Sequence, residues 1–469
     1  MGIRTERPRQ VCSNAVPVCI RGSARRTRRG CIASHPSFVR HEVPLSARKD
    51  AIALYVIQGC NFLVPLLALP WLSRTLGPEK FGQLGFAQAF IQFFIMMTDF
   101  GFDLTAARKV SINRDNPVEL ARLYWTVTIA KGGLAALSIL VVVVMLLCVP
   151  SLYPDRWVIA IGFLSVVGTV LNPLWLYQGL ERMPRMALVS LLSRVACLVP
   201  FFLFVRSPQD YLIAAATIFL PLMLSGLWLT GAAHVNGMVT SWQRVTWADL
   251  REQSADAFQI FSGSALTFLY TYANTVVLRF IGGNVQVGYY VTADKLTSPI
   301  RQLLWPLVQT LFPRVCKLYA QGDTAAAEEI VRKLISAVVL VNALAILTIY
   351  LVGDRLVLLL FGARFMPALP VLKVLIFLPF ILALAIILLQ LRLVARGELR
   401  SLKRIYAIGA GFHAIQLIWL VTWLGALGTA IAVVSTETLV TGLVYYECRK
   451  LRHRGRAVEP SLRIGDGPA

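Results

Sequence analysis

Residues 123–147 read LYWTVTIAKGGLAALSILVVVVMLL, an apolar stretch with a single charged residue, Lys131. A helix needs roughly 20 mostly apolar residues to cross a bilayer, because the hydrocarbon core is about 30 Å thick and a helix rises about 1.5 Å per residue. This stretch is therefore long enough to span a membrane. It is predicted to be helical, because lipid cannot satisfy an open backbone and the chain shows no alternating strand pattern.

Similar apolar stretches recur along the 469-residue chain. With 123–147, the predicted spans are 51–72, 83–103, 157–177, 186–205, 209–230, 256–278, 289–312, 331–352, 366–389, 402–424 and 427–446. The mean hydropathy is +0.66. Charged residues make up 15% of the chain, against about 25% in soluble domains. We therefore predict an all-α integral membrane protein with about 12 transmembrane helices.

The distribution of basic residues predicts the orientation. With the N-terminus inside, the inner loops hold 17 Lys and Arg residues and the outer loops hold 7, while the tails add 11 and 6. Cytoplasmic loops carry the excess of Lys and Arg in membrane proteins, so both termini are predicted to be cytoplasmic. The net charge of +22 is explained mostly by these tails and loops. Such charges also attract anionic lipid headgroups, and no nucleic-acid partner is expected.

The regions outside the predicted spans are small. Residues 1–48 and 448–469 are predicted to be basic cytoplasmic tails, the first of them disordered, and residues 233–255 to be an amphipathic cytoplasmic linker. The eight cysteines form no Cys-x-x-Cys pair and the five histidines are dispersed, so no metal site is expected. No phosphate-binding loop or His-Glu-x-x-His motif occurs. We therefore do not expect an enzyme.

Short sequence matches link the first half of the chain to the second. They pair 74–77 (Arg-x-x-Gly) with 279–282, 81–82 (apolar-Gly) with 287–288, and 178–182 with 396–400. The first two pairs are offset by 205 and 206 residues. A repeat of six spans preserves orientation, so its copies are related by an axis along the membrane normal. The sequence thus predicts two pseudo-symmetric six-helix lobes, residues 49–232 and 256–447.

Equivalent helices of the two lobes carry polar side chains on one face. The polar stripes consist of Gln88, Gln92, Asp99 and Asp103 in span 83–103, and of Asp294, Ser298, Arg301, Gln302, Trp305 and Gln309 in span 289–312. The first four positions plus 206 give 294, 298, 305 and 309, so the same helical face is polar in both spans. Since lipid offers no hydrogen bonds, both stripes are predicted to face a shared central cavity.

Basic residues also lie inside the predicted spans. They are Lys131, Arg194, Lys295, Arg301 and Lys373. Each costs about 2.5–3.5 kcal/mol at the centre of a bilayer. Arg and Lys bind phosphate, so we expect these five to bind an anionic headgroup such as a polyprenyl diphosphate. A structural interpretation stays open, in which Asp294 pairs with Arg301 and Arg194 pairs with Asp210 or Glu437.

The remaining polar residues of the spans suggest two further roles. The sugars of a lipid-linked glycan would need hydrogen-bonding partners, and the predicted lining is Gln88, Gln92, Asp99, Ser298, Gln302, Gln309, Tyr270 and Asn274. Asp294 and Glu437 are candidates for binding a coupling proton or sodium ion. Asp256 is explained more simply by the helix N-terminus on which it lies. No resident cofactor is expected.

The chain resembles the Wzx-type polysaccharide flippases of the multidrug/oligosaccharidyl-lipid/polysaccharide exporter superfamily over about 49–447. The residues that carry the resemblance are Leu72–Gly82, Asp99–Gly101, Phe261–Gly263, Val287–Tyr290, Leu311–Arg314, Tyr319–Asp323 and Leu360–Phe365. The resemblance implies a two-lobe, V-shaped transporter of 12 to 14 helices in the bacterial inner membrane. It implies that alternating access moves undecaprenyl-diphosphate-linked oligosaccharides for O-antigen, capsule or exopolysaccharide to the outer leaflet. Some relatives have a positively charged lumen, whereas the tail 1–48 departs from their usual short N-terminus.

Alternative functions differ in the features they need. A cation-coupled drug antiporter of the same superfamily needs an acidic cavity, whereas the charges inside these spans are mostly basic. A polysaccharide polymerase or ligase needs a large outer loop, and no predicted outer loop exceeds about 13 residues. A scaffold gains nothing from ionisable residues inside the membrane. The expected partners are the lipid-linked glycan and the bilayer, and a polysaccharide polymerase and chain-length regulator are further candidates.

Overall fold

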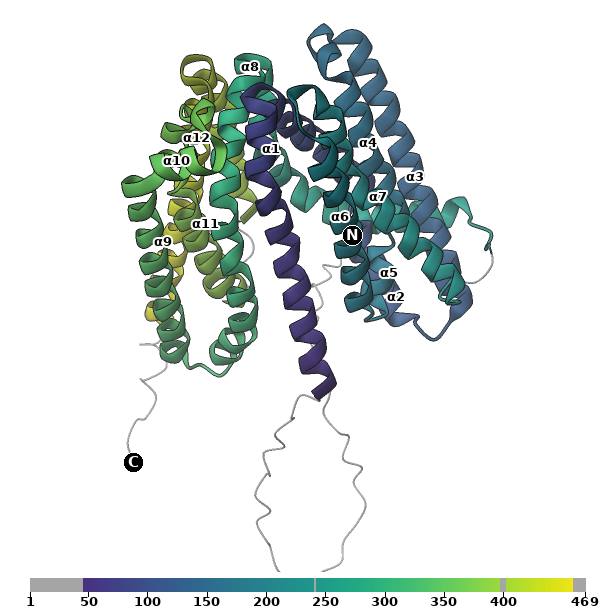
Figure 1. Ribbon diagram of the computed structural model, residues 1–469. Helices are drawn as coiled ribbons and strands as arrows, with labels where there is room; N and C mark the ends of the chain where they lie inside the picture. Colours follow the sequence, from purple (N-terminus) through teal and green to yellow (C-terminus); the bar gives the residue numbers. More distant parts are fainter. Residues whose placement is uncertain (1–44, 240–241, 397–401, 459–469) are drawn as a thin grey trace, which may run out of the picture. The chain divides into compact units, whose positions relative to one another are not determined.

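The computed structural model describes residues 45–239, 242–396 and 402–458, and it contains helices and no strands in these ranges (Figure 1). The chain divides into two compact units, residues 1–48 and 49–469, and almost all of the described residues belong to the second. The helices are α1 (Leu45–Asp99), α2 (Phe102–Ile112), α3 (Pro117–Cys148), α4 (Arg156–Leu171), α5 (Leu174–Gly179), α6 (Met183–Phe204), α7 (Tyr211–Val235), α8 (Trp247–Ala320), α9 (Thr324–Phe361), α10 (Ala368–Leu375), α11 (Leu378–Ile386) and α12 (Leu402–Val458). Shorter helical segments are η1 (Pro150–Asp155), η2 (Pro208–Asp210), η3 (Ala363–Phe365), the π-helix η4 (Ile387–Leu393) and η5 (Val394–Arg396). The predicted tails lie largely outside the described residues.

The all-helical membrane class is confirmed. Each predicted span falls almost wholly within these helices, and α1, α8 and α12 each contain two spans. Eight helical stretches of the described residues are long and apolar enough to cross a membrane. α8 is not among them. The count of twelve crossings therefore stays a prediction.

Glycines break the three long helices into pairs. Gly77 in α1 has φ 70° and ψ 174°, and Gly283 in α8 has φ 78° and ψ 176°. A positive φ is readily adopted by glycine, which has no Cβ to clash with the backbone. The two breaks are 206 residues apart and have nearly the same geometry. The structure therefore aligns Gly77 with Gly283, one residue beyond the Gly282 that the Arg-x-x-Gly match suggested.

The two repeats cross just after these breaks. A Cβ added to Gly82 would lie 1.8 Å from the carbonyl oxygen of Asn284, and one added to Gly288 would lie 2.2 Å from that of Pro78. Gly288 is the equivalent of Gly82, and Asn284 is the equivalent of Pro78, because the members of each pair are 206 residues apart. The two contacts are therefore equivalent, as expected for a pseudo-two-fold axis between α1 and α8. Glycine allows the two backbones to meet at this axis, because any side chain would collide with a carbonyl group.

Two arginines bind across the halves next to the crossing. Arg74 of the first half (α1–α7) donates to the carbonyl of Leu359, near the end of α9 in the second half (α8–α12). Arg279 of the second half donates from Nε and Nη2 to Oδ2 of Asp155, at 3.1 and 2.8 Å. The Asp155 carboxylate is fully buried, and Gln83 Nε2 donates to its other oxygen at 2.7 Å. A buried carboxylate is stable only when it is paired in this way.

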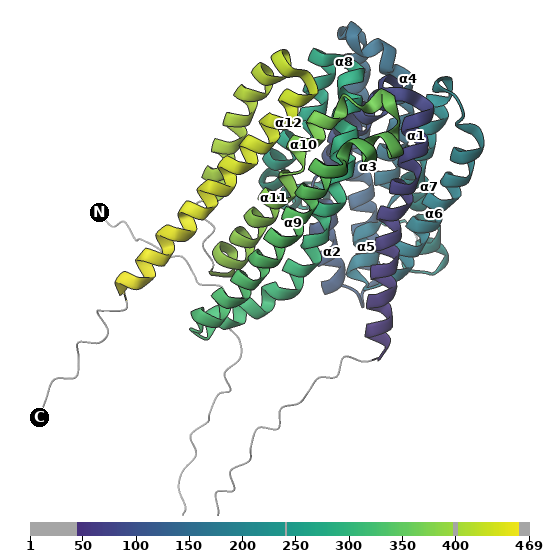
Figure 2. The same ribbon diagram turned by 60° about the vertical axis from the view of Figure 1, so that its left-hand side comes forward.

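One end of the helices carries a hydrophobic cluster that both halves share. The ends of α3 and α9 and the start of α7 belong to one cluster that includes residues of both halves. At the opposite end, the starts of α3 and α9 lie in two separate clusters. Within the halves, α7 packs on α4 and α6, and α8 packs on α12 (Figures 1 and 2). By the positive-inside rule, the joined end is predicted to face away from the cytoplasm.

α2 also contacts the start of α8 at the opposite end. Lys109 Nζ lies 3.0 Å from Glu252 Oε1 and 2.9 Å from Asp256 Oδ2. The ring of Phe100 stacks on that of Phe261 with centroids 4.7 Å apart. The two halves therefore also touch at this end, where the start of α8 meets the first half.

Candidate functional site

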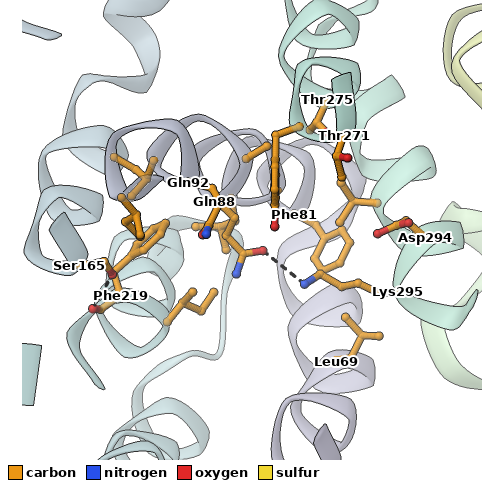
Figure 3. A pocket seen from close by; sticks show the side chains of 18 of the residues that line it. Leu69, Phe81, Gln88, Gln92, Ser165, Phe219, Thr271, Thr275, Asp294 and Lys295 are labelled. Carbon is orange, nitrogen blue, oxygen red and sulfur yellow. Dashed lines mark hydrogen bonds between the residues drawn. The ribbon is translucent and has the colours of Figure 1, made fainter. Parts of the chain in front are cut away.

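A cavity of about 920 Å³ lies between the two repeats. The first half contributes residues of α1, α4, α6 and α7, and the second half contributes residues of α8, α11 and α12 (Figure 3). This volume lies in the range that encloses drug-sized ligands. The central cavity between two lobes is therefore present, as the sequence predicted.

Polar residues of the equivalent helices α1 and α8 meet in the cavity. Lys295 Nζ donates to Gln88 Oε1 at 3.3 Å, and Gln92 follows one turn later on the same face of α1 (Figure 3). Arg301 Nη2 donates to Asp294 Oδ1 at 2.6 Å. Since Asp294 occupies the position equivalent to Gln88, the two polar stripes do face each other across the cavity at this level.

The described lining residues carry a basic excess. The basic side chains are those of Arg194, Lys295 and Arg301, and the acidic ones are those of Asp294 and Glu437. Part of the positive charge is neutralised by the ion pair between Asp294 and Arg301. This pair is the structural interpretation that the sequence left open for the two charges. Charges act over longer distances in a low-dielectric protein interior than in water. The cavity is therefore suited to an anion more than to an organic cation.

A buried histidine network forms another part of the cavity wall. His413 is 2% exposed, and its Nε2 lies 2.7 Å from Asn274 Oδ1 while its Nδ1 lies 2.8 Å from Thr436 Oγ1. Gln416 Nε2 donates to Thr436 Oγ1 at 2.7 Å and to the carbonyl of Ala432 at 2.9 Å. The network joins α8 to both parts of α12, on either side of the break at Gly425.

The structure brings many of the predicted residues into the cavity. The cavity-lining residues among them are Gln88, Gln92, Arg194, Asn274, Asp294, Lys295, Arg301 and Glu437. The side chain of Tyr270 lies outside the described residues. The binding roles predicted for these residues stay predictions, because their positions alone do not identify a ligand.

Lys131 and Asp99 are not brought to the described cavity lining. Lys131 is 1% exposed, and its Nζ lies 2.8 Å from Asp99 Oδ1 and 2.7 Å from Asp103 Oδ1. The helix breaks directly after Asp99, at Phe100 and Gly101, which have φ 47° and 84°, so Asp103 lies on α2. Lys131 is thus held by two carboxylates instead of facing the cavity beside Arg301.

Other predicted residues also lie away from the described lining. Lys373 is on α10, with Nζ 5.5 Å from the centroid of the Tyr350 ring. The Ser298 hydroxyl donates to the carbonyl of Lys295 at 3.3 Å. Gln302 and Gln309 are exposed beyond the part of α8 that lines the cavity. The stripe of the second half therefore extends past the cavity.

Sequence reasoning missed His413, Gln416 and Thr436. The available signal was a histidine within the apolar span 402–424, with Gln416 three residues later on the same helical face. An ionisable residue inside a membrane span suggests a functional site by default. The overall dispersion of the histidines obscured this signal, since the partners of His413 come from distant parts of the chain.

Comparison with known proteins identifies the family. Residues 47–319 match the family described as polysaccharide biosynthesis protein. A protein of Escherichia coli (strain K12) named as an O-antigen transporter is 31% identical over 404 residues, which cover 85% of this chain and 96% of that protein. A protein of Shigella dysenteriae with the same name is 27% identical over 397 residues, which cover 84% and 98%. These relatives are transporters, in agreement with the expectation that the chain is not an enzyme.

Solved structures share the fold. The lipid II flippase MurJ in an inward closed conformation matches with a TM-score of 0.67 and 11% identity, over 86% of this chain and 87% of that one. An inward-facing multidrug resistance transporter of the MATE family matches with a TM-score of 0.66 and 15% identity, over 86% and 96%. The family match and the 31% identical relative show that the chain belongs to the polysaccharide biosynthesis protein family, and the solved structures show that it has the fold of the MurJ and MATE transporters.

Proposed function

We propose that this protein moves polyprenyl-diphosphate-linked oligosaccharides from the cytoplasmic to the periplasmic leaflet of the bacterial inner membrane. The observation that carries the proposal is the cavity between the repeats, which is lined by three basic and two acidic residues. A diphosphate group is an anion that Arg and Lys bind well. The O-antigen transporter relatives support this class of cargo.

We propose alternating access as the mechanism. The halves share a hydrophobic cluster at the end predicted to face outward, while the starts of α3 and α9 lie in different clusters at the other end. This asymmetry fits a state that receives cargo from the cytoplasmic side. Movement about the crossing of α1 and α8 would exchange the open and closed ends. Both termini are proposed to be cytoplasmic, with the polymerase and the chain-length regulator as further partners.

A drug antiporter of the MATE type shares the fold but fits the cavity less well. Organic cations are attracted by an acidic cavity, and the described lining carries a basic excess. Of the two residues proposed for coupling-ion binding, Asp294 is already paired with Arg301, and Glu437 lines the cavity. The anionic, lipid-linked cargo is therefore the function that the geometry supports best.

Reconstitution tests this proposal. The full-length protein is placed in liposomes that contain undecaprenyl diphosphate linked to N-acetylglucosamine, and a membrane-impermeant lectin reports the fraction of sugar in the outer leaflet. The protein is expected to speed exchange between leaflets relative to protein-free liposomes. An N-acetylglucosamine lipid that lacks the diphosphate serves as the control and should exchange slowly. Equal rates with and without the protein would refute the proposed function.

A further inference from the structure

We infer that His413 is a proton-binding site of the cavity, and that its protonation is linked to binding of the anionic headgroup. The inference rests on the proposed function for the identity of that headgroup. It starts from a residue that the substrate-binding proposal does not use. His413 lines the cavity but is 2% exposed, and both its ring nitrogens lie within 2.8 Å of an oxygen.

The partner of Nε2 determines which nitrogen can titrate. Asn274 Nδ2 donates to the carbonyl of Thr271 at 3.2 Å, so Asn274 Oδ1 is the atom that faces Nε2. A carboxamide oxygen only accepts hydrogen bonds, and Nε2 must therefore carry a hydrogen. Nδ1, which faces Thr436 Oγ1, is bare in the neutral ring and is the atom that takes up a proton.

The Thr436 hydroxyl can form a hydrogen bond with Nδ1 in both the neutral and the protonated state of His413. A hydroxyl group donates one hydrogen bond and also accepts. When His413 is neutral, the Thr436 hydroxyl donates to Nδ1, and the carbonyl of Ala432 still receives the amide of Gln416 at 2.9 Å. When a proton from cavity water binds to Nδ1, N–H donates to Thr436 Oγ1, and the hydroxyl turns to the carbonyl of Ala432 at 2.7 Å. The water that delivers the proton as hydronium stays in the cavity.

Gln416 fixes the positions of the groups that take part in this change of hydrogen bonds. Its amide nitrogen contacts both Thr436 Oγ1 and the Ala432 carbonyl, and its Oε1 accepts from the Ser435 hydroxyl at 2.9 Å. Rotation of one hydroxyl thus accommodates the added proton without leaving one of these groups unsatisfied. A buried polar group without a partner costs about 1–3 kcal/mol. A network that avoids this cost in both states allows the histidine to change charge inside the protein.

The electrostatic surroundings predict the sign of the linkage. The titratable and charged groups that line the cavity with His413 are Glu437, Tyr272, Tyr290, Asp294, Lys295, Arg301 and Arg194, and Tyr406 lies near Glu437. Protonation of His413 adds one positive charge to a cavity that already has a basic excess, so it strengthens the binding of an anion. By reciprocity, anion binding must then favour uptake of the proton.

The test measures affinity against pH with a ligand that does not itself titrate. Both phosphates of undecaprenyl diphosphate linked to N-acetylglucosamine are substituted, so this probe keeps its charge over the range in which histidine titrates, about pH 5–8. The full-length protein is expected to bind the probe several-fold more tightly at the acid end. Because only one proton is linked to binding, the affinity can change by at most about tenfold per pH unit. Binding in weakly buffered solution should also take up a proton, as a pH dye would report.

The variants separate a proton site from a structural one. H413Q keeps a donor for Asn274 but cannot carry the charge, so its affinity should no longer depend on pH. H234Q is the matched control, because His234 is exposed, lies outside the cavity lining and hydrogen-bonds to the carbonyl of Thr230 in its own helix, and it should behave like the parent. T436V removes the hydroxyl that accepts a hydrogen bond from the protonated ring, so protonation becomes less favourable. The pH at which the affinity changes should therefore be lower in this variant.

Each outcome decides between the claims. A parent protein that does not bind the probe would refute the proposed function itself. Binding that is independent of pH in the parent, or equally pH-dependent in H413Q, would overturn the assignment of His413 and leave the proposed function standing. Loss of the pH dependence in Glu437→Gln with His413 intact would assign the proton to Glu437. If H413Q does not fold, an unchanged pH midpoint in T436V would equally overturn the inference.

Discussion

Arg301 is the residue on which the proposed binding of cargo depends most. Its guanidinium lines the cavity and lies 2.6 Å from the Asp294 carboxylate. Arg301→Ala leaves two basic and two acidic lining residues, and we expect the leaflet-exchange rate to fall at least tenfold, about 1.4 kcal/mol in the barrier. Arg301→Lys keeps the charge but loses the fork that binds two phosphate oxygens, so it should retain part of the rate.

The control for Arg301 is an exposed cation outside the cavity. Lys333 forms a surface pair with Glu329 on α9, and its side chain is 75% exposed. Such surface pairs contribute about 0–1 kcal/mol, so Lys333→Ala should exchange the lipid at the parent rate. Equal rates for Arg301→Ala and the parent would remove Arg301 from the binding site.

Lys131 is predicted to act through stability instead of cargo binding. Its ammonium group holds Asp99 and Asp103 together across the break between α1 and α2. Lys131→Met leaves two carboxylates beside each other, and breaking a buried pair costs about 3–5 kcal/mol. We expect a clear loss of thermal stability in detergent, and the further changes Asp99→Asn and Asp103→Asn should restore much of it. An unchanged melting temperature would contradict this role.

The crossing of α1 and α8 is the element whose geometry the fold depends on. Gly288→Ala would place a Cβ 2.2 Å from the backbone carbonyl of Pro78, which cannot move without shifting α1. We expect this variant to lose stability by several kcal/mol or to misassemble. Gly231→Ala on α7 is the matched control, because nothing lies within 4 Å of its added Cβ. It should be neutral or stabilising by about 1 kcal/mol, since alanine favours a helix.

The result is read from melting temperature and from the elution profile of the purified protein. Equal stability of the Gly288→Ala and Gly231→Ala variants would show that α1 and α8 do not meet at Gly288. The same comparison applies to Gly82, which contacts Asn284 in the equivalent way.

The helices and the repeat could be predicted from sequence because hydropathy and spacing are local properties of the chain. The polar face shared by Gln88 and Asp294 followed from helical periodicity, and both residues line the cavity. The position of Lys131 did not follow, because it depends on ion pairs between α3 and carboxylates on two other helices, Asp99 of α1 and Asp103 of α2. The His413 network was equally inaccessible, since it depends on contacts between α8 and α12 that are distant in sequence.

For the whole molecule, the arginines that cross between the halves are expected to keep one end closed. Arg279 donates to the fully buried carboxylate of Asp155 in the other half. Arg279→Ala leaves that carboxylate without its cation, which favours separation of the halves at this end. We expect the cavity to become accessible from the periplasmic side, measured as faster labelling of a cavity cysteine by an impermeant thiol reagent added there. Unchanged labelling would show that Arg279 does not hold this end closed.

The central claim is that the two repeats enclose a water-filled chamber that receives a diphosphate. Its most direct test is thiol labelling of Gln88→Cys in a background without the eight native cysteines. Leu140→Cys is the control, because Leu140 is 60% exposed on α3 within an apolar span and is expected to face lipid. We predict that a water-soluble reagent added from the cytoplasmic side modifies the cysteine at 88, spares the one at 140, and is blocked by undecaprenyl diphosphate linked to N-acetylglucosamine. Failure to label position 88 from either side, or labelling that the lipid does not slow, would contradict the claim.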